Sequence, residues 1–151
     1  MAATLASSRI FEGFLGDPTR AFLHGHTFTG NPLGARVALE VLAVYREERV
    51  LERAVPKAER IAACFTRLGA LPGVLGARSL GMVGALDLNT RGYLDQSGWR
   101  VYEEARRRGA YLRPLGSTVY VTPPVNIPDA DLDELLGIVE ESVSAVVRGG
   151  A

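Results

Sequence analysis

The segment at residues 24–32, which reads HGHTFTGNP, contains side chains that could do chemistry. His24 and His26 are two residues apart, so in an extended segment they would share a face and could bind a metal. No third ligand is placed nearby, because the nearest acid, Asp17, lies across a turn, and a metal site is therefore disfavoured. The favoured alternative is an anion site, in which threonine hydroxyls and glycine amides meet a negative group beside a helix N-terminus.

Arg113 is the second candidate for a functional side chain. It stands between Leu112 and Pro114 in a predicted strand with mostly apolar neighbours, so its guanidinium needs a carboxylate or phosphate partner. That partner could belong to the protein, as a structural ion pair, or to a ligand, as a clamp, and the residues alone leave both open. Tyr120, on the opposite arm of the same predicted hairpin, could come close to Arg113 and favours the clamp.

The other reactive side chains have plainer interpretations. Cys64 is the one cysteine and lies in an apolar stretch of a predicted helix, which is typical of a small core residue. Residues 106–108 are arginines at a helix end, where positive charge suits the helix dipole, and Glu103 is spaced to pair with Arg107. The sequence has no P-loop, nucleophile elbow or CxxC motif, and Asp87 shows no pairing that suggests acid–base catalysis.

Composition limits the classes of protein to which the chain can belong. Its 151 residues suit one domain, or a small domain plus part of another, and 47% apolar with 23% charged residues is typical of a globular protein. The formal net charge is zero, so nothing favours nucleic acid or anionic lipid as a partner. No apolar run reaches the ~18 residues of a membrane span, and no export signal is recognisable, so we expect a cytoplasmic protein outside the membrane.

The first third of the chain is predicted to contain a short helix, a short strand and one long helix. The apolar residues expected to face inward from the short helix are Ile10, Phe11, Phe14 and Leu15. Residues 16–18 end this helix, and residues 21–23 form the strand. The long helix begins at Asn31 and Pro32, because asparagine is a good N-cap and proline at the first helical position loses no needed amide. Its apolar residues recur at helical spacing, and the charges at residues 46–49 end the pattern.

From about residue 55 the predicted order is helix, strands, helix, hairpin, helix, which favours an α+β domain with a sheet covered on one side. The expected ranges are a helix at 56–68 and then one or two strands over 74–78 and 80–88, interrupted by Gly81 and Gly84. A loop at 92–98, a helix at 99–108, strands at 111–113 and 118–121, and a last helix that begins at Pro128 and Asp129 follow. The buried stripe of that last helix is Leu132, Leu135, Leu136, Val139, Val143 and Val147.

Four stretches, spread over nearly the whole chain, resemble one protein family. They are AATL at residues 2–5, HGHTFTGNPL at 24–33, LGMVG at 80–84, and the hairpin RPLG…Y…PP at 113–124. Together they resemble the class III, fold type I aminotransferases, which depend on pyridoxal 5'-phosphate, and among them the branch that acts in biotin synthesis. The resemblance implies an α/β chain that forms the C-terminal part of this fold. Residues 1–50 would be the end of the large cofactor domain with its crossover helix, and residues 51–151 the small α+β domain.

The resemblance also implies roles for the candidate residues. His26 and Thr27 would contact the cofactor phosphate of the neighbouring subunit across a homodimer interface, and Gly25 would lie beside the amino-acceptor substrate. Arg113 would bind the carboxylate of 8-amino-7-oxononanoate, which favours the clamp, and Tyr120 would line the same pocket. Family members more often have proline where His26 stands, although a histidine variant is familiar.

One departure from the family concerns the Schiff-base lysine, which the resemblance places shortly upstream of the AATL element. The chain begins directly before Ala2, and its one lysine, Lys57, lies in a predicted helix far from that point. Arginine cannot replace the amine, because guanidinium stays protonated. The chain alone is therefore expected to have no catalytic residue, to bind pyridoxal phosphate only with the missing N-terminal part, and to be inactive by itself.

The complete enzyme of this branch would move the amino group of S-adenosylmethionine to 8-amino-7-oxononanoate and give 7,8-diaminononanoate. Two alternatives stay open: part of another class III (ω-type) aminotransferase, or a non-catalytic small-domain module that binds a partner chain. The chain could be a gene-call fragment, one half of a split gene that assembles with a separate N-terminal half, or such a module, and the first two are favoured. We expect residues 1–30 to be mobile in the isolated chain.

Overall fold

The computed structural model describes residues 2–88 and 96–149 of the chain. The chain divides into two compact units, Met1–Glu48 and Arg49–Ala151, each with its own set of internal contacts. Within the described residues, every helix is too short or too polar to span a lipid bilayer.

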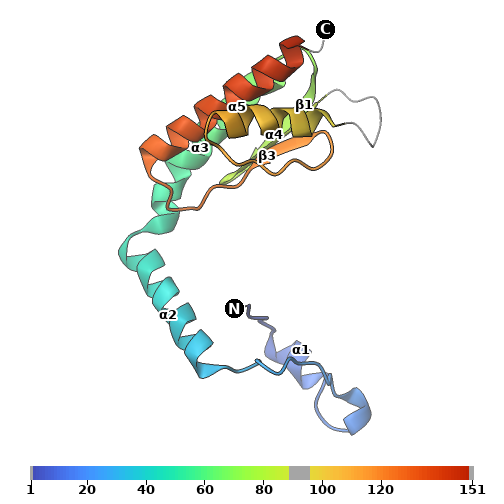
Figure 1. Cartoon of the computed structure of the whole chain (residues 1–151). Helices are drawn as coiled ribbons and strands as arrows, with labels where there is room; N and C mark the ends of the chain where they lie inside the picture. The colour runs from blue at the N-terminus through green and yellow to red at the C-terminus, as the bar shows by residue number, and fades with distance from the viewer. Residues whose placement is uncertain (1, 89–95, 150–151) are drawn as a thin grey trace. The chain divides into compact units, whose positions relative to one another are not determined.

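In the described part of the first unit, the regular elements are helical (Figure 1). They are α1 at Ser8–Glu12, the 3₁₀ turn η1 at Pro18–Arg20, and α2 at Pro32–Glu47. Asn31 caps α2, because its side-chain oxygen accepts hydrogen bonds from the amides of Leu33 at 3.0 Å and Gly34 at 3.4 Å. The long helix and its start are as the sequence predicts. The strand expected at residues 21–23 is wrong, because a strand needs a pairing partner and this unit supplies none.

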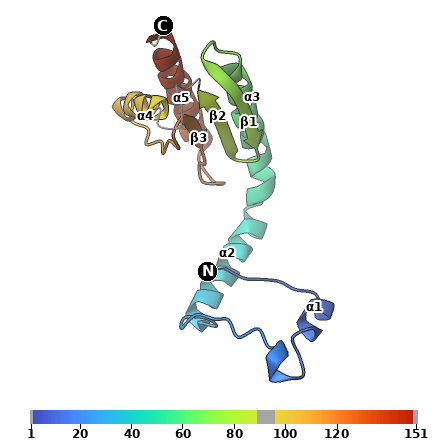
Figure 2. The ribbon, with the colours of Figure 1, turned by 90° about the vertical axis from the view of Figure 1, so that its right-hand side faces the viewer.

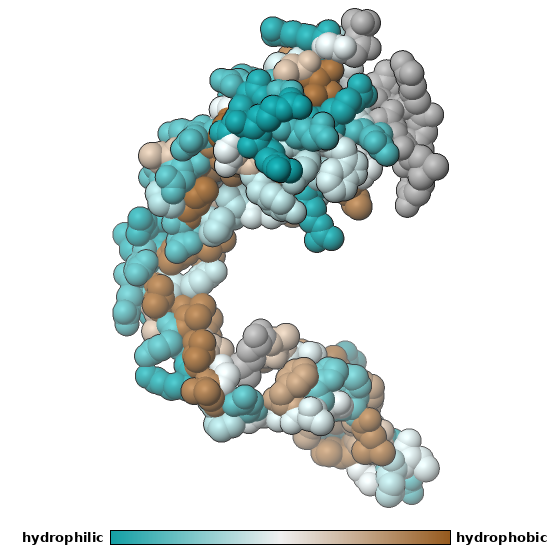
Figure 3. Space-filling view, in the orientation of Figure 1, coloured by the Kyte–Doolittle hydropathy of each residue, from teal (hydrophilic) through white to brown (hydrophobic). Residues whose placement is uncertain are grey.

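No described residue of the first unit is buried, although the unit is rich in apolar side chains. Ile10 is 52% exposed and Phe11 is 61% exposed, so the prediction that α1 turns these residues inward is wrong for the chain by itself. Figure 3 shows hydrophobic side chains, in brown, along α2. The exposed large apolar residues of this helix are Leu33, Val37, Leu39, Val41, Leu42 and Val44. Apolar residues on several sides are typical of a helix that other protein covers.

The second unit is built on an antiparallel sheet, with the strand order β1-β2-β3 in the described residues. The strands are β1 at Val74–Leu80, β2 at Val83–Leu88 and β3 at Thr118–Val121. Residues 81 and 82 form the turn between β1 and β2, and Gly81 supplies the positive φ of 54° that this turn uses. The sequence predicts strands here but places Leu80 in the second one, whereas Leu80 ends β1 and pairs with Val83.

Helices α3 and α5 pack side by side against the sheet, and α4 packs on α5 (Figure 2). The helices are α3 at Val50–Gly69, α4 at Ser97–Arg107 and α5 at Asp129–Gly149. Alternate residues of the strands point into the core, where Leu86 and Val119 meet Phe65 of α3 and Val139 of α5. This is the α+β arrangement, with a sheet covered on one side, that the sequence predicts. The predicted stripe of α5 is buried at Leu132, Leu136, Val139 and Val143, and partly buried at Leu135 and Val147.

Strand β2 lies very close to α3 at Gly84. A Cβ atom at this position would be 2.4 Å from the ring of Phe65 and 2.8 Å from the side chain of Ile61, which is closer than real atoms approach. Phe65 is 1% exposed and Ile61 is 0% exposed, so neither side chain has free space to move into. Glycine at position 84 therefore allows the sheet and the helix to pack in direct contact.

Two predicted helix starts are wrong. Helix α3 begins at Val50, so Pro56 lies inside its second turn instead of at its first residue. Pro56 has no amide hydrogen, so the carbonyl of Glu52, four residues earlier, goes without its helical hydrogen bond at this point. Helix α4 begins at Ser97 rather than at Trp99, which removes residues 97 and 98 from the predicted loop. Of the rest of that loop, Gln96 is the N-cap of α4, and residues 92–95 lie outside the described residues.

The predicted strand at residues 111–113 is also wrong, since this segment has no regular structure. The bridge to β3 is a single one, between Leu115 and Thr118. Pro114 has no amide to donate to a sheet, so it prevents the ladder from continuing back to Arg113.

Candidate functional site

A groove of about 480 Å³ lies where the chain enters and leaves β3. Its lining comes from residues 111–113, before the strand, and from residues 120–124 with Ile127, at the end of the strand and after it. Arg113 and Tyr120, which the sequence expects to be neighbours, line this same groove. Leu112 and Val121 are buried at its base, whereas Arg113 is exposed.

Arg113 has no ion-pair partner in the described chain. No carboxylate of residues 2–88 and 96–149 lies within 4.0 Å of its guanidinium. Arg60 and Arg78 in the same unit do have carboxylate partners. Of the two interpretations that the sequence leaves open, the structural ion pair is therefore absent among the described residues. The guanidinium is available to a ligand in the groove.

The turn between Arg113 and Tyr120 is held in shape by its own hydrogen bonds and by α4. Leu115 and Thr118 exchange two amide-to-carbonyl hydrogen bonds of 2.9 Å each, and Gly116 between them adopts a φ of 59°. Gly98, in the first turn of α4, packs directly on this turn, because a Cβ there would be 2.3 Å from the carbonyl oxygen of Gly116. This packed turn joins the two segments that line the groove.

In the first unit, residues 24–31 form a turn that leads into α2. The amide of His26 donates to the hydroxyl of Thr29 at 2.9 Å, and the amide of Thr29 donates to the carbonyl of His26 at 2.9 Å. The side chain of Thr29 therefore accepts a hydrogen bond within the turn, and that of Asn31 accepts hydrogen bonds from the first amides of α2. Thr27 makes no hydrogen bond with a described residue, so its hydroxyl and amide are free to meet an anion.

The two histidines belong to a row of ring contacts along this exposed segment. The ring centroids of Phe22 and His24 are 5.5 Å apart, those of His24 and His26 5.3 Å, and those of His26 and Phe28 5.1 Å. No group of three or more histidine, cysteine, aspartate or glutamate residues that could hold a metal occurs among the described residues.

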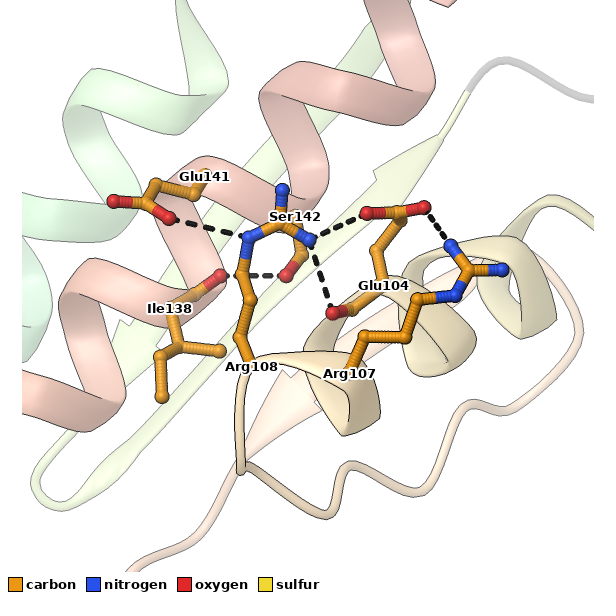
Figure 4. A network of polar contacts seen from close by, with 6 residues as sticks. All are labelled: Glu104, Arg107, Arg108, Ile138, Glu141 and Ser142. Carbon is orange, nitrogen blue, oxygen red and sulfur yellow. Dashed lines mark hydrogen bonds and ion pairs between the residues drawn. The ribbon is translucent and has the colours of Figure 1, made fainter.

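A polar cluster joins the end of α4 to α5 (Figure 4). Glu104 forms ion pairs with Arg107 and Arg108, and Nε of Arg108 also donates to Glu141 at 3.1 Å. The hydrogen bond from Arg108 is the main reason that the pKa of Glu104 lies below its ordinary value. The sequence predicts Glu103 as the partner of Arg107, which is wrong, because Glu104 lies one residue nearer. Each charge in this cluster is paired, as in a structural contact between helices.

The structure pairs Asp87 with Arg78 and Thr118, two partners that the sequence analysis does not name. Arg78 donates to its carboxylate at 2.5 Å and the hydroxyl of Thr118 donates at 2.7 Å, so the contacts cross all the strands of the described sheet. These hydrogen bonds, that from Arg78 first, hold the pKa of Asp87 below its ordinary value. The missing signal is the register: a turn at residues 81 and 82 places Arg78 opposite Ala85, beside Asp87 on the same face.

Cys64 is fully buried in the core of the second unit. Burial raises the pKa of its thiol to about 12, so the group stays protonated and unreactive at neutral pH. The prediction that Cys64 is a core residue is confirmed.

Comparison with protein families matches residues 1–143 to the class III aminotransferases, and the chain belongs to this family. Two similar proteins are adenosylmethionine-8-amino-7-oxononanoate aminotransferases. That of Nitratidesulfovibrio vulgaris is 40% identical over 160 residues, covering 100% of this chain and 30% of the relative. That of Geobacter sulfurreducens is 36% identical, covering 99% of this chain and 35% of the relative. The chain thus spans about a third of the length of these relatives.

Solved structures agree with this assignment. The adenosylmethionine-8-amino-7-oxononanoate aminotransferase from Methanocaldococcus jannaschii matches with a TM-score of 0.83 at 28% identity, over 92% of this chain and 34% of that one. The PMP-bound aminotransferase from Vibrio fluvialis matches with a TM-score of 0.78 at 25% identity, over 89% of this chain and 31% of that one. The prediction of a mixed α/β chain that forms part of the fold type I aminotransferase fold is confirmed.

Proposed function

We propose that this chain is the acceptor-binding part of an aminotransferase that moves the amino group of S-adenosylmethionine to 8-amino-7-oxononanoate, giving 7,8-diaminononanoate. The observation that carries the proposal is the unpaired guanidinium of Arg113 in the groove beside Tyr120. An oxo acid of this kind ends in one carboxylate, and the arginine fork binds a carboxylate through two parallel hydrogen bonds. Pro123 and Pro124 supply apolar lining for its hydrocarbon chain. Two relatives that match nearly the whole chain carry this activity in their names.

Pyridoxal 5'-phosphate would supply the electron sink for the reaction when bound. The described residues fit its phosphate in part. Thr27 has a free hydroxyl and amide, and its turn leads into the N-terminus of α2, where the helix dipole favours an anion. We propose that Thr27 contacts the phosphate across a homodimer interface and that Gly25, which has no side chain, leaves room for the acceptor. His26 would contribute through its imidazole, because its amide is bonded to Thr29.

The lysine of this chain does not fit the task of holding the cofactor. Lys57 is 4% exposed, and its Nζ donates to the carbonyl of Ile127 at 2.5 Å, whereas the reaction needs an accessible amine. We therefore propose that the amine belongs to the part of the relatives that residues 1–151 do not match, and that these residues alone are inactive. The unburied apolar side chains of α2 support this proposal, because they need cover from other protein.

A second candidate is an aminotransferase that uses another amine donor and a shorter oxo acid as its acceptor. The putrescine–pyruvate aminotransferase of Pseudomonas aeruginosa is 34% identical over 122 residues, covering 76% of this chain and 27% of that protein. One free arginine in a groove suits the carboxylate of other oxo acids as well. The length of the acceptor that the groove binds best distinguishes the two candidates.

The test of the groove is an NMR titration of the ¹⁵N-labelled chain with octanoate, a straight-chain carboxylate, and with 1-octanol, which has the same chain without the charge. The proposal expects saturable shifts at Arg113 and Tyr120 with octanoate and much weaker ones with octanol. Equal binding of the two probes, or octanoate shifts confined to other residues, would contradict it. Binding of pyruvate at the same position with higher affinity than octanoate would favour the second candidate.

A further inference from the structure

Lys57 is a buried cation in the second unit. Among the described residues the buried polar or charged side chains are Lys57, Ser97 and Ser142. Of these three side chains, that of Lys57 alone carries a charge. Lysine is rarely buried without a partner, because removing an ammonium from water is costly. It is also the only lysine in a chain that has sixteen arginines. An uncharged side chain of similar length would fill this position at lower cost, so the ammonium needs an explanation.

The ammonium reaches one specific backbone atom. Nζ of Lys57, on α3, donates to the carbonyl oxygen of Ile127 at 2.5 Å, across 70 positions in the sequence. The amide of Ile127 in turn donates to the carbonyl of Pro124 at 3.0 Å. The anchored residue therefore closes a turn that contains Pro124, and both Pro124 and Ile127 line the groove.

Arg60, one helical turn after Lys57, holds the residues that follow. Its guanidinium donates to the carboxylate of Asp129 at 2.7 Å and to the carbonyl of Asp129 at 2.9 Å, and it also forms an ion pair with Asp133. Lys57 and Arg60 lie on one face of α3, because residues three apart are neighbours on a helix. Together they bind the end of the segment at residues 122–127 and the first turn of α5. Arg60 thus fixes the helix, and Lys57 fixes the turn before it.

We propose that Lys57 is a positioning residue for the groove: it holds the turn from Pro124 to Ile127 in place as the wall that faces the ligand of Arg113. Without the ammonium, the carbonyl of Ile127 would lose its partner in the core, and the turn would be free to take other positions. The ligand-binding consequence rests on the proposed function, in which the groove accepts a straight-chain carboxylate. Ordering this turn in advance removes part of the entropic cost of binding.

The test compares Lys57→Met with Ile61→Val. Methionine has nearly the length of lysine and fills the buried path without the charge. The free energy no longer spent on burying the ammonium offsets part of the cost of leaving the carbonyl of Ile127 without a donor. Ile61→Val is the matched control, since it removes a buried methyl group from the same helix and leaves the contact with Ile127 intact. Lys57→Gln is the rescue variant, because its amide is a neutral donor on a side chain only one bond shorter than that of lysine. It also serves if Lys57→Met fails to fold.

The measurements use the full ¹⁵N-labelled chain. In Lys57→Met the amide of Ile127 should exchange at least about tenfold faster than in the wild type, and octanoate should bind about tenfold more weakly, while the amides of β2 exchange no faster than in the control. Ile61→Val should change neither quantity, and Lys57→Gln should restore part of both. A lysine-selective label gives one side-chain ammonium signal, which should persist at neutral pH because burial slows its exchange with water.

The outcomes separate this proposal from the proposed function. Unchanged exchange at Ile127 in Lys57→Met, or an ammonium signal lost to fast exchange in the wild type, would overturn the anchor. Faster exchange with unchanged octanoate affinity would reduce Lys57 to a structural role and overturn its positioning of the groove. If the wild type itself binds no octanoate, the proposed function fails, and the exchange of the Ile127 amide alone then decides for or against the anchor.

Discussion

Two arginines of the second unit show that the partner, and not the residue type, decides what a side chain does. Arg78 lies on the open face of the sheet and is bound by Asp87. Arg113 lies on an exposed segment beside a groove and has no carboxylate partner in the described residues. Exposed ion pairs contribute little to stability, so the fold loses little when a surface arginine is left free for a ligand.

We predict that Arg113→Ala and Arg78→Ala have opposite effects. Arg113→Ala should keep the free energy of unfolding within about 0.5 kcal/mol of the wild type, because the side chain is exposed and unpaired, and should abolish the octanoate shifts at Tyr120. Arg78→Ala should retain octanoate binding and lose a little stability, since it frees Asp87. Urea unfolding and the NMR titration measure both quantities. Retained binding in Arg113→Ala together with a large loss of stability would make Arg113 a structural residue.

Asp87 makes part of the stability of the second unit depend on pH. The pKa of Asp87 is lower in the folded chain than its ordinary value, because Arg78 and Thr118 donate to its ionised form. The ionised carboxylate therefore stabilises the fold above the unfolded pKa of ~3.9, and this stabilisation is lost as the pH falls through the folded pKa. Asp87→Asn should lower the melting temperature at pH 7, and the difference from the wild type should shrink below about pH 4. Thermal unfolding followed by circular dichroism measures this difference. A difference in melting temperature that grows as the pH falls would contradict the assignment.

The residue types alone suggest candidate residues, but not their contacts. An arginine among apolar neighbours and a tyrosine on the facing arm suggest Arg113 and Tyr120, and the two side chains line one groove. The role of Thr27 stays a prediction. The pairing of Asp87 is not recognisable, since it depends on a strand register that a shift of one residue would destroy. The hydrogen bond from the amide of His26 to the hydroxyl of Thr29 is not recognisable either, because it depends on the conformation of a local turn.

At the scale of elements, periodicity predicts the type of a segment, helix or strand, more accurately than it predicts the residues at which the segment begins and ends. The helical spacing of α2 and α5 is visible in the sequence, and both helices form where it places them. The expected strands at residues 21–23 and 111–113 do not form, because a strand exists only where another strand pairs with it. The early start of α3 is hidden because proline favours the first position of a helix and costs a hydrogen bond inside one, so Pro56 indicates a helix start where the helix in fact continues.

Close contact between β2 and α3 gives a test of the fold. We predict that Gly84→Ala destabilises the second unit by about 1–3 kcal/mol, because the added methyl group would overlap Phe65 and Ile61. Gly76→Ala is the matched control in β1, where nothing lies within 4 Å of the added atom, and it should be near neutral. Urea unfolding of both variants measures the difference. Equal stabilities would mean that β2 and α3 are farther apart than the structure has them.

At the scale of the whole molecule, the two units differ in what they bury. The second unit has a core that draws on α3, the strands, α4 and α5, whereas no described residue of the first unit is buried. Ordering each residue costs about 1–2 kcal/mol of conformational entropy, and apolar burial is the main term that offsets it. The described residues of the first unit bury too little apolar surface to offset the entropy cost of ordering them.

We predict that amide exchange divides the chain at the boundary between the units. In the monomer, amides of α2 should exchange nearly as fast as in an unfolded peptide, while those of β2, α3 and α5 should be protected by the core of the second unit. Exchange of the labelled chain in deuterated water, followed by NMR, gives the comparison. Equal protection of the two units in a monomer would show that the first unit is stable without a partner.

The central claim is that this chain needs further polypeptide to act as an aminotransferase and that Arg113 then binds the acceptor. The direct measurement is amino transfer from S-adenosylmethionine to 8-amino-7-oxononanoate by the chain mixed with the part of the Nitratidesulfovibrio vulgaris relative that this chain does not match. The account predicts that neither protein is active alone, that the mixture is active, and that Arg113→Ala raises the KM for the acceptor far more than it changes the KM for the donor. Transfer by the chain alone, or a stable complex with no transfer, would contradict the account.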